Sequence, residues 1–271
     1  MELLTEILNV LQARMETPQP YGWFHLLFFA ASIAGGILLC VFCKNDRPAK
    51  ARAILLTASV ISLLLEVYKQ IVYTYTVQDG TIVADFQWYA FPWQFCSMPM
   101  YTGLIAGLLP KGRVHDSLCA FQATYGLFGG ICVMVYPVQV FIEMIGINIQ
   151  TMVCHGLMIS VGIWLLGSGY VKLEHKTILR ALPVFGCTVG IAMILNEIAH
   201  LTGLLETDTF NMFYISPYCD PSLPVYSIVQ QYVPYPWCLI LYIAGFTAAA
   251  YIVLLAAMGI QNLATRKKSR V

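Results

Sequence analysis

Two segments of the sequence, residues 91–99 (FPWQFCSMP) and 150–156 (QTMVCHG), determine how the chain is expected to fold. Each segment opens a long apolar run, and each carries one reactive side chain, Cys96 or His155, about five residues inside that run. A helix rises 1.5 Å per residue, so both side chains are expected roughly 7–8 Å from the helix end. The two segments therefore place a thiol and an imidazole at the same depth in an apolar helical bundle.

The composition indicates what kind of bundle this is. Hydrophobic residues make up 59% of the 271 residues, charged residues make up 11%, and the mean hydropathy is +0.71. Such a chain is too apolar for a soluble domain and too long for a single anchor. The net charge of +1 argues against a nucleic-acid partner, because a surface that binds nucleic acid must neutralise many phosphates. We therefore expect a polytopic, all-α membrane protein.

Seven apolar runs are long enough to cross a bilayer, which needs about 20 apolar residues per helix. We expect spans at 22–43, 53–75, 91–110, 116–137, 150–171, 180–201 and 237–260. The chain is then a single membrane domain, 1–271, with an amphipathic surface helix in 1–20, a seven-helix bundle in 22–260 and a basic cytoplasmic tail in 261–271. The surface helix is expected because apolar side chains recur at helical spacing, at Leu3, Leu4, Ile7, Leu8, Leu11 and Met15.

Basic residues set the expected orientation of the bundle. All but two of the 15 basic residues, Arg14 and Lys69, follow the first, third, fifth or seventh span; Lys44, Arg47 and Arg270 are among them. The positive-inside rule then puts the N-terminus outside and the C-terminus in the cytoplasm. The opposite loops hold acidic residues, namely Asp79, Asp85, Glu143, Glu206, Asp208 and Asp220.

Two pairs of glycines have the spacing that lets membrane helices approach closely. Gly103 and Gly107 lie in the third expected span, and Gly186 and Gly190 lie in the sixth. Small residues four apart form a smooth stripe on a helix, so both pairs predict close packing against a neighbouring helix.

Polar side chains at membrane depth are costly, and they usually face the bundle interior or a cavity. The third and fifth spans run in the opposite direction to the second and sixth, so the polar ends of all four are expected in one layer of the outer leaflet. Around Cys96 and His155, this layer is predicted to contain Glu66, Lys69, Gln94, Asn196, Glu197, His200 and Asn211.

A cysteine beside a histidine is the minimum for thiol nucleophilic catalysis, because the imidazole can take the thiol proton and stabilise the thiolate. Pro99 is expected to kink the helix beside Cys96, since it lacks an N–H and clashes with the carbonyl of Phe95. A kinked helix at membrane depth is tolerated mainly where protein or water lines it.

Other members of the layer could support the same reaction. Gln94 and Asn196 carry amide donors that could bind an oxyanion. Either Glu66 or Glu197 could orient His155.

Each of these residues also has a simpler explanation. Cys96 could be a small packing residue and His155 a structural histidine bonded to a neighbouring carbonyl. Glu66 and Lys69, like Glu197 and His200, are three residues apart and could simply pair with each other. A zinc site built from His155, His200 and Glu197 is a further alternative, although we expect no metal.

Four pieces of the sequence resemble those of a known family. They are Pro92-Trp93-Gln94-Phe95-Cys96, Phe128-Gly129-Gly130 with Tyr136-Pro137, His155-Gly156, and residues 211–217 (NMFYISP) with Tyr235-Pro236-Trp237. In this order the chain resembles the YwaF-like integral membrane protein family and its animal relative, a transmembrane acyltransferase that remodels ether phospholipids. The resemblance implies that Cys96 and His155 form the catalytic pair. More distant membrane hydrolases of fatty-acid esters look similar, but they use threonine in place of the cysteine.

Together these observations predict a lipid acyltransferase that moves an acyl chain from a phospholipid to a lysophospholipid through an acyl-enzyme on Cys96, without a cofactor. A hydrolase is a variant of this hypothesis. The alternative is a seven-helix binding or transport protein for a small polar or lipid ligand. We expect the bacterial cell membrane as its location, with the endoplasmic reticulum membrane as the alternative.

Overall fold

The computed structural model describes residues 2–43, 48–137, 140–203, 209–220 and 223–268. Lys44, Arg47, Glu206, Asp208 and Arg270, which contribute to the expected charge asymmetry, lie outside the described residues. The described helices are α1 (Glu2–Leu11), α2 (Trp23–Phe42), α3 (Pro48–Thr74), α4 (Met98–Leu108), α5 (Arg113–Phe121), α6 (Leu127–Val135), α7 (Ile145–Gly167), α8 (Lys176–Thr202), α9 (Pro224–Tyr232) and α10 (Trp237–Lys268).

The chain is a multi-pass, predominantly helical membrane protein. Within the described residues, six helical segments are long and apolar enough to cross a membrane: Trp23–Phe42, Ala49–Thr74, Arg113–Val135, Ile145–Gly167, Lys176–Thr202 and Trp237–Thr265. The region of the third expected span, 91–110, holds a shorter apolar helix, Phe95–Leu108. At 1.5 Å per residue this helix covers about 20 Å, less than the roughly 30 Å of a hydrocarbon core.

Helix α4 nevertheless runs antiparallel to α3. At the start of α3, Arg52 donates hydrogen bonds to the carbonyls of Gly107 (3.0 Å) and Leu108 (3.4 Å), the last residues of α4. The two helices approach closely because Gly107 has no side chain; a Cβ there would lie 2.6 Å from Leu56. The close packing predicted for Gly103 and Gly107 is therefore confirmed.

The other predicted glycine pair behaves differently. A Cβ at Gly186 or Gly190 would meet no described atom within 4 Å. The prediction that these glycines mark a close approach was wrong, because no described neighbour comes within contact distance of either position.

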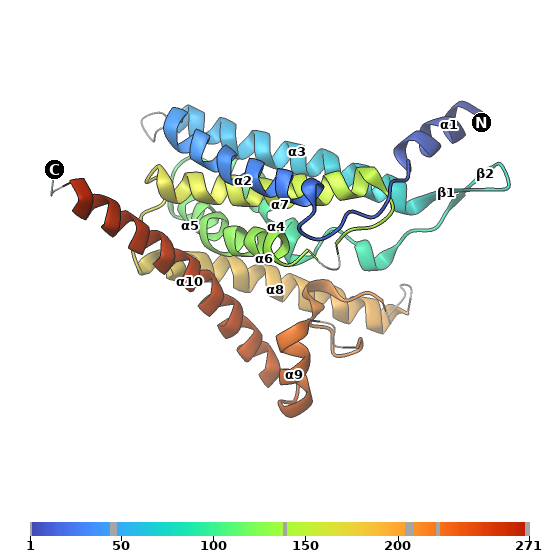
Figure 1. The fold of residues 1–271 in the computed structure, drawn as a ribbon. Helices are drawn as coiled ribbons and strands as arrows, with labels where there is room; N and C mark the ends of the chain where they lie inside the picture. The colour runs from blue at the N-terminus through green and yellow to red at the C-terminus, as the bar shows by residue number, and fades with distance from the viewer. Residues whose placement is uncertain (1, 44–47, 138–139, 204–208, 221–222, 269–271) are drawn as a thin grey trace.

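The two ends of the bundle are distinct (Figure 1). A two-stranded antiparallel hairpin, β1 (Tyr75–Gln78) and β2 (Thr81–Ala84), extends from the end of α3. We call this the hairpin end. Helix α1 is attached there, because Tyr68 donates a hydrogen bond to the carbonyl of Leu11 (2.6 Å) and Gln12 donates one to that of Val72 (2.9 Å). Helix α10 crosses the bundle obliquely and ends at the opposite end (Figure 1).

Helices α5 and α6 are joined without a break by a π-helical turn, Gln122–Gly126. The turn is fully buried, and the Gln122 amide donates hydrogen bonds to the carbonyl of Pro99 and to Thr102 (3.2 Å). A π-turn inserts one extra residue into a helix and is common at functional sites. Here it points a buried amide at the first turn of α4.

The kink predicted at Pro99 is absent, and that prediction was wrong. Helix α4 begins at Met98, so Pro99 lies in its first turn. An N–H in that position has no intrahelical partner, and proline is therefore tolerated there. Cys96 consequently lies just before the helix rather than five residues inside it.

Candidate functional site

Four of the predicted side chains line one cavity of about 250 Å³. Glu66 and Lys69 come from α3, Cys96 from the turn before α4, and His155 from α7. The structure therefore brings the thiol and the imidazole to a common space.

Cys96 lies in a short 3₁₀ turn, Phe95–Ser97, that leads directly into α4. Cys96 is exposed, and it is one of the residues that line the cavity. The turn is closed by a hydrogen bond from the Ser97 N–H to the carbonyl of Gln94 (2.9 Å). Cys96 lies two residues before Met98, where α4 begins, and the helix dipole favours negative charge at that end of a helix.

His155 is buried, and its two ring nitrogens have different environments. Nδ1 donates a hydrogen bond to the carbonyl oxygen of Thr151 at 2.7 Å. A carbonyl accepts only from a protonated nitrogen, so in the neutral ring Nε2 carries the lone pair. Nε2 is buried and has no hydrogen-bond partner among the described residues. The ring is thus held in the tautomer of a base, with its basic nitrogen unoccupied.

The thiol and Nε2 are not hydrogen-bonded to each other within the described chain. Catalytic hydrogen bonds in ligand-free sites are often long and tighten when substrate binds. What the structure supplies is a shared cavity, an accessible thiol and a free basic nitrogen.

The common depth of the two residues arises differently from the sequence prediction. Helix α7 begins at Ile145, so His155 lies ten residues, about 15 Å, from its start, and the estimate of five residues was wrong. Cys96 lines the same cavity from the turn that precedes α4, which begins only at Met98. A late helix start leaves room for a cavity at the hairpin end.

Two glycines of α6 allow the walls of the site to close up. A Cβ at Gly129 would lie 2.7 Å from the ring of Phe95, and one at Gly130 would lie 2.9 Å from the carbonyl oxygen of His155. Helix α6 can therefore pack directly against both the turn that carries Cys96 and the backbone of His155.

Glu66 and Lys69 form the ion pair that their spacing predicts, with Nζ and Oε1 2.8 Å apart. Gln70 fixes the same carboxylate by donating a hydrogen bond at 2.7 Å, and it also donates one to the carbonyl of Ala90 at 2.8 Å. A charge pair is thus held in the wall of the cavity.

Gln94, Asn196 and Asn211 do not line this cavity. The Asn196 amide makes two hydrogen bonds to the backbone of Met212 (2.8 and 3.1 Å). Gln94 accepts from Phe213 N–H (2.9 Å) and donates to Asn211 O (3.0 Å), and Asn211 accepts from Ser216 N–H (2.9 Å). These amides hold a buried loop, in which Phe213 and Tyr214 both have positive φ angles, 59° and 57°.

Glu197 and His200 lie apart from the site on an exposed face of α8. Tyr218 donates a hydrogen bond to Glu197 (2.9 Å) and stacks on the His200 ring at 3.5 Å. The zinc alternative needed these two side chains beside His155. No group of three or more metal-binding side chains occurs in the part of the chain that the structure describes.

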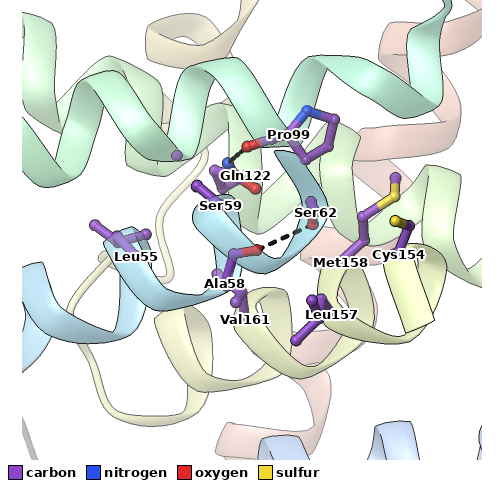
Figure 2. Close-up of a pocket in the computed structure, with 11 residues that line it drawn as sticks. Leu55, Ala58, Ser59, Ser62, Pro99, Gln122, Cys154, Leu157, Met158 and Val161 are labelled. Atoms are coloured by element: carbon purple, nitrogen blue, oxygen red, sulfur yellow. Dashed lines mark hydrogen bonds between the residues drawn. The ribbon is translucent and has the colours of Figure 1, made fainter. Parts of the chain in front are cut away.

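The sequence prediction missed Cys154, a second thiol in the cavity. It also lines a smaller pocket of about 20 Å³ between α3, α4, the π-turn and α7, where Gln122, Ser59 and Ser62 gather (Figure 2). About 10–15 Å³ of such volume is enough for one water molecule, so the small pocket has the size and polarity of a water site. The adjacency of Cys154 to His155 was the available signal.

Comparison with known proteins gave one match. The model of the TMEM164 family matches residues 18–258, which covers most of the chain and all six long helices except the end of α10. No curated protein and no solved structure matches the chain.

Proposed function

This chain belongs to the TMEM164 family, and on that premise we propose that it is a membrane-embedded lipid acyltransferase with Cys96 as nucleophile and His155 as base. The observation that carries the proposal is the buried, unpartnered Nε2 of His155, which lines the same cavity as the open thiol of Cys96. Leaving a buried polar nitrogen without a partner costs free energy, so a site that retains one is expected to use it.

In the first half of the reaction, His155 Nε2 accepts the Cys96 proton and the thiolate attacks the ester carbonyl carbon of a phospholipid. The tetrahedral intermediate collapses with cleavage of the bond between that carbon and the glycerol oxygen. The imidazolium returns its proton to the departing oxygen, which leaves a lysolipid and a thioester on Cys96.

In the second half, Nε2 takes the proton of an acceptor lysophospholipid hydroxyl, whose oxygen attacks the thioester carbon. The carbon–sulfur bond breaks and the sulfur regains the proton from His155. No cofactor is required, because donor and acceptor are both esters or alcohols of the same lipid class. The apolar bundle limits the water that would otherwise hydrolyse the thioester.

We further propose that the chain crosses the membrane seven times, with α4 and the turns before it as the third crossing and with the N-terminus outside. The antiparallel contact of Arg52 with the end of α4 supports this count. The cavity then opens towards the outer leaflet, most simply of a bacterial cell membrane; in a eukaryotic cell the corresponding membrane is the endoplasmic reticulum.

The test uses purified protein in vesicles that contain a phospholipid with a labelled acyl chain. We expect hydroxylamine-sensitive label on Cys96 and transfer of label to added lysophospholipid. The Cys96→Ser variant should lose both, whereas Cys187→Ser, which removes an exposed thiol on α8 outside the cavity, should keep both. Cys154→Ser tests whether the second thiol of the cavity takes the label instead.

Absence of label and transfer from wild type, with Cys96→Ser behaving identically, would leave the binding or transport alternative. Release of free fatty acid without transfer would make the protein a hydrolase.

A further inference from the structure

Lys69 is placed unusually for a lysine near the end of a membrane helix. It lies five residues, about 7–8 Å, before the last residue of α3, Thr74. Lysines in such positions ordinarily extend towards the nearest headgroups. Lys69 instead turns back along the helix to Glu66, and its side chain is only 17% exposed. The ammonium group is therefore held in the wall of the cavity.

The hydrogen-bonding capacity of Lys69 is only partly used. An ammonium group has three N–H donors, and Glu66 is the one polar partner of Lys69 within the described residues. Burying unpaired donors of a charged group is costly in a low-dielectric interior. The remaining donors are therefore free for a ligand that enters the cavity.

Lys69 also lies close to the reactive groups. Cys96, Cys154 and His155 all line the same cavity as Lys69. An anionic group bound to Lys69 would therefore occupy the cavity that Cys96 also lines.

We infer that Lys69 binds the phosphodiester group of the lipid substrate, and that Glu66 holds the ammonium group in place for it. The inference rests on the proposed function, since it names the part of the phospholipid that positions the ester at Cys96. A phosphodiester matches a point-like cation with two unused donors, and its ester groups are joined to it by a short glycerol linker. A neutral ester lipid offers Lys69 only uncharged carbonyl and hydroxyl acceptors, which bind an ammonium group more weakly than a phosphodiester does.

The test measures binding in the Cys96→Ser background, where no acyl-enzyme can form. Radiolabelled lysophosphatidylcholine, at fixed mole fraction in detergent micelles, is displaced by unlabelled lysophosphatidylcholine, by monoacylglycerol or by free fatty acid, all with the same acyl chain. Glycerophosphocholine, which has the phosphodiester but no chain, is the fourth competitor. With Lys69 present, we expect lysophosphatidylcholine to compete at least about tenfold better than monoacylglycerol.

Three variants isolate the contribution of Lys69. The double variant Glu66→Gln/Lys69→Met removes both charges, so no uncompensated buried charge remains to unfold the protein. In this variant, the preference for lysophosphatidylcholine over monoacylglycerol should fall to a ratio of about one. Lys69→Arg should keep the preference. Lys111→Met is the matched control, because Lys111 lies over the Tyr170 ring outside the cavity, and it should also keep it.

An unchanged preference in the double variant would overturn the inference. The inference would also fail if competition by free fatty acid depended on Lys69 as strongly as competition by lysophosphatidylcholine does. It would fail too if glycerophosphocholine competed as well as lysophosphatidylcholine, because the site would then bind a free phosphodiester rather than a lipid. Because binding is measured without the nucleophile, a failed acyl-transfer assay leaves this result intact, and a failed preference leaves the acyl-transfer assay intact.

Discussion

At the residue scale, the two buried histidines near the hairpin end differ in one respect. His25 uses both ring nitrogens: Nδ1 accepts from the Tyr21 N–H (3.0 Å) and Nε2 donates to the carbonyl of Met134 (2.9 Å). His155 uses only Nδ1. The free nitrogen is therefore what separates a catalytic assignment from a structural one, and sequence alone could not supply it because it depends on what surrounds each ring.

The first prediction compares these histidines. His155→Gln should slow acylation of Cys96 at least about 100-fold, the contribution expected of a general base, with little change in thermal stability. His25→Gln should lower thermal stability, because it breaks two buried hydrogen bonds, and should change the acylation rate of the folded protein only a few-fold. Single-turnover labelling and thermal unfolding measure the two effects; equal rates in both variants would remove His155 from the mechanism.

At the element scale, the buried loop that contains Met212 explains why three amides predicted for the site lie elsewhere. The sequence positions of these amides predict how deep they lie in the membrane. Their hydrogen-bond partners, however, are backbone groups of a loop, and hydrophobic periodicity does not predict loop structure. The sequence does carry a signal for the hairpin, since Asp79-Gly80 is a turn pair flanked by β-branched residues, but the long apolar runs on either side favour helix.

The second prediction concerns this loop. Asn196→Ala leaves the buried N–H of Met212 unpaired and leaves its carbonyl with only the long hydrogen bond from Ile215 N–H (3.4 Å), which should destabilise the protein by about 1–3 kcal/mol. Asn262→Ala, at an exposed position of α10, should be neutral. Thermal unfolding in a fixed detergent measures both, and equal stability of the two variants would contradict a structural role for Asn196.

The third prediction concerns helix packing behind the site. Gly130→Ala should destabilise the protein by about 1–3 kcal/mol and slow acylation, because the new Cβ would press on the carbonyl of His155. Gly190→Ala meets no described atom within 4 Å and should be neutral or stabilising by up to about 1 kcal/mol. If both variants gained stability, close packing of α6 on α7 would not support the site.

At the scale of the whole molecule, apolar composition and run length were enough to predict a multi-pass helical membrane protein. They were not enough to predict where α4 begins, since Phe95 and its neighbours are as apolar as the helix that follows. The cavity depends on where α4 begins. The sequence therefore predicted the approximate polar layer and four of the residues that line the cavity, but not the turn that brings Cys96 into it.

The fourth prediction follows from seven crossings. Tags at the two termini should lie on opposite sides of the membrane: a protease added to intact cells should remove the N-terminal tag and spare the C-terminal one. Removal of both tags, or of neither, while lysed cells lose both, would require an even number of crossings and would leave α4 as a helix that does not complete a crossing.

The late start of α4 also has a dynamic consequence. The neighbouring helices have continuous backbone hydrogen bonds, whereas residues 86–97 are held by short turns such as Ser97 N–H to the carbonyl of Gln94 (2.9 Å). Side chains add two bonds, since Gln70 donates to the carbonyl of Ala90 (2.8 Å) and Tyr101 donates to that of Pro92 (2.9 Å). Deuterium should therefore enter this stretch well before it enters the facing turns of α7. A lipid bound in the cavity would slow deuterium uptake in residues 86–97 but not in α7. Lipid binding would then make this stretch more rigid without changing the fold.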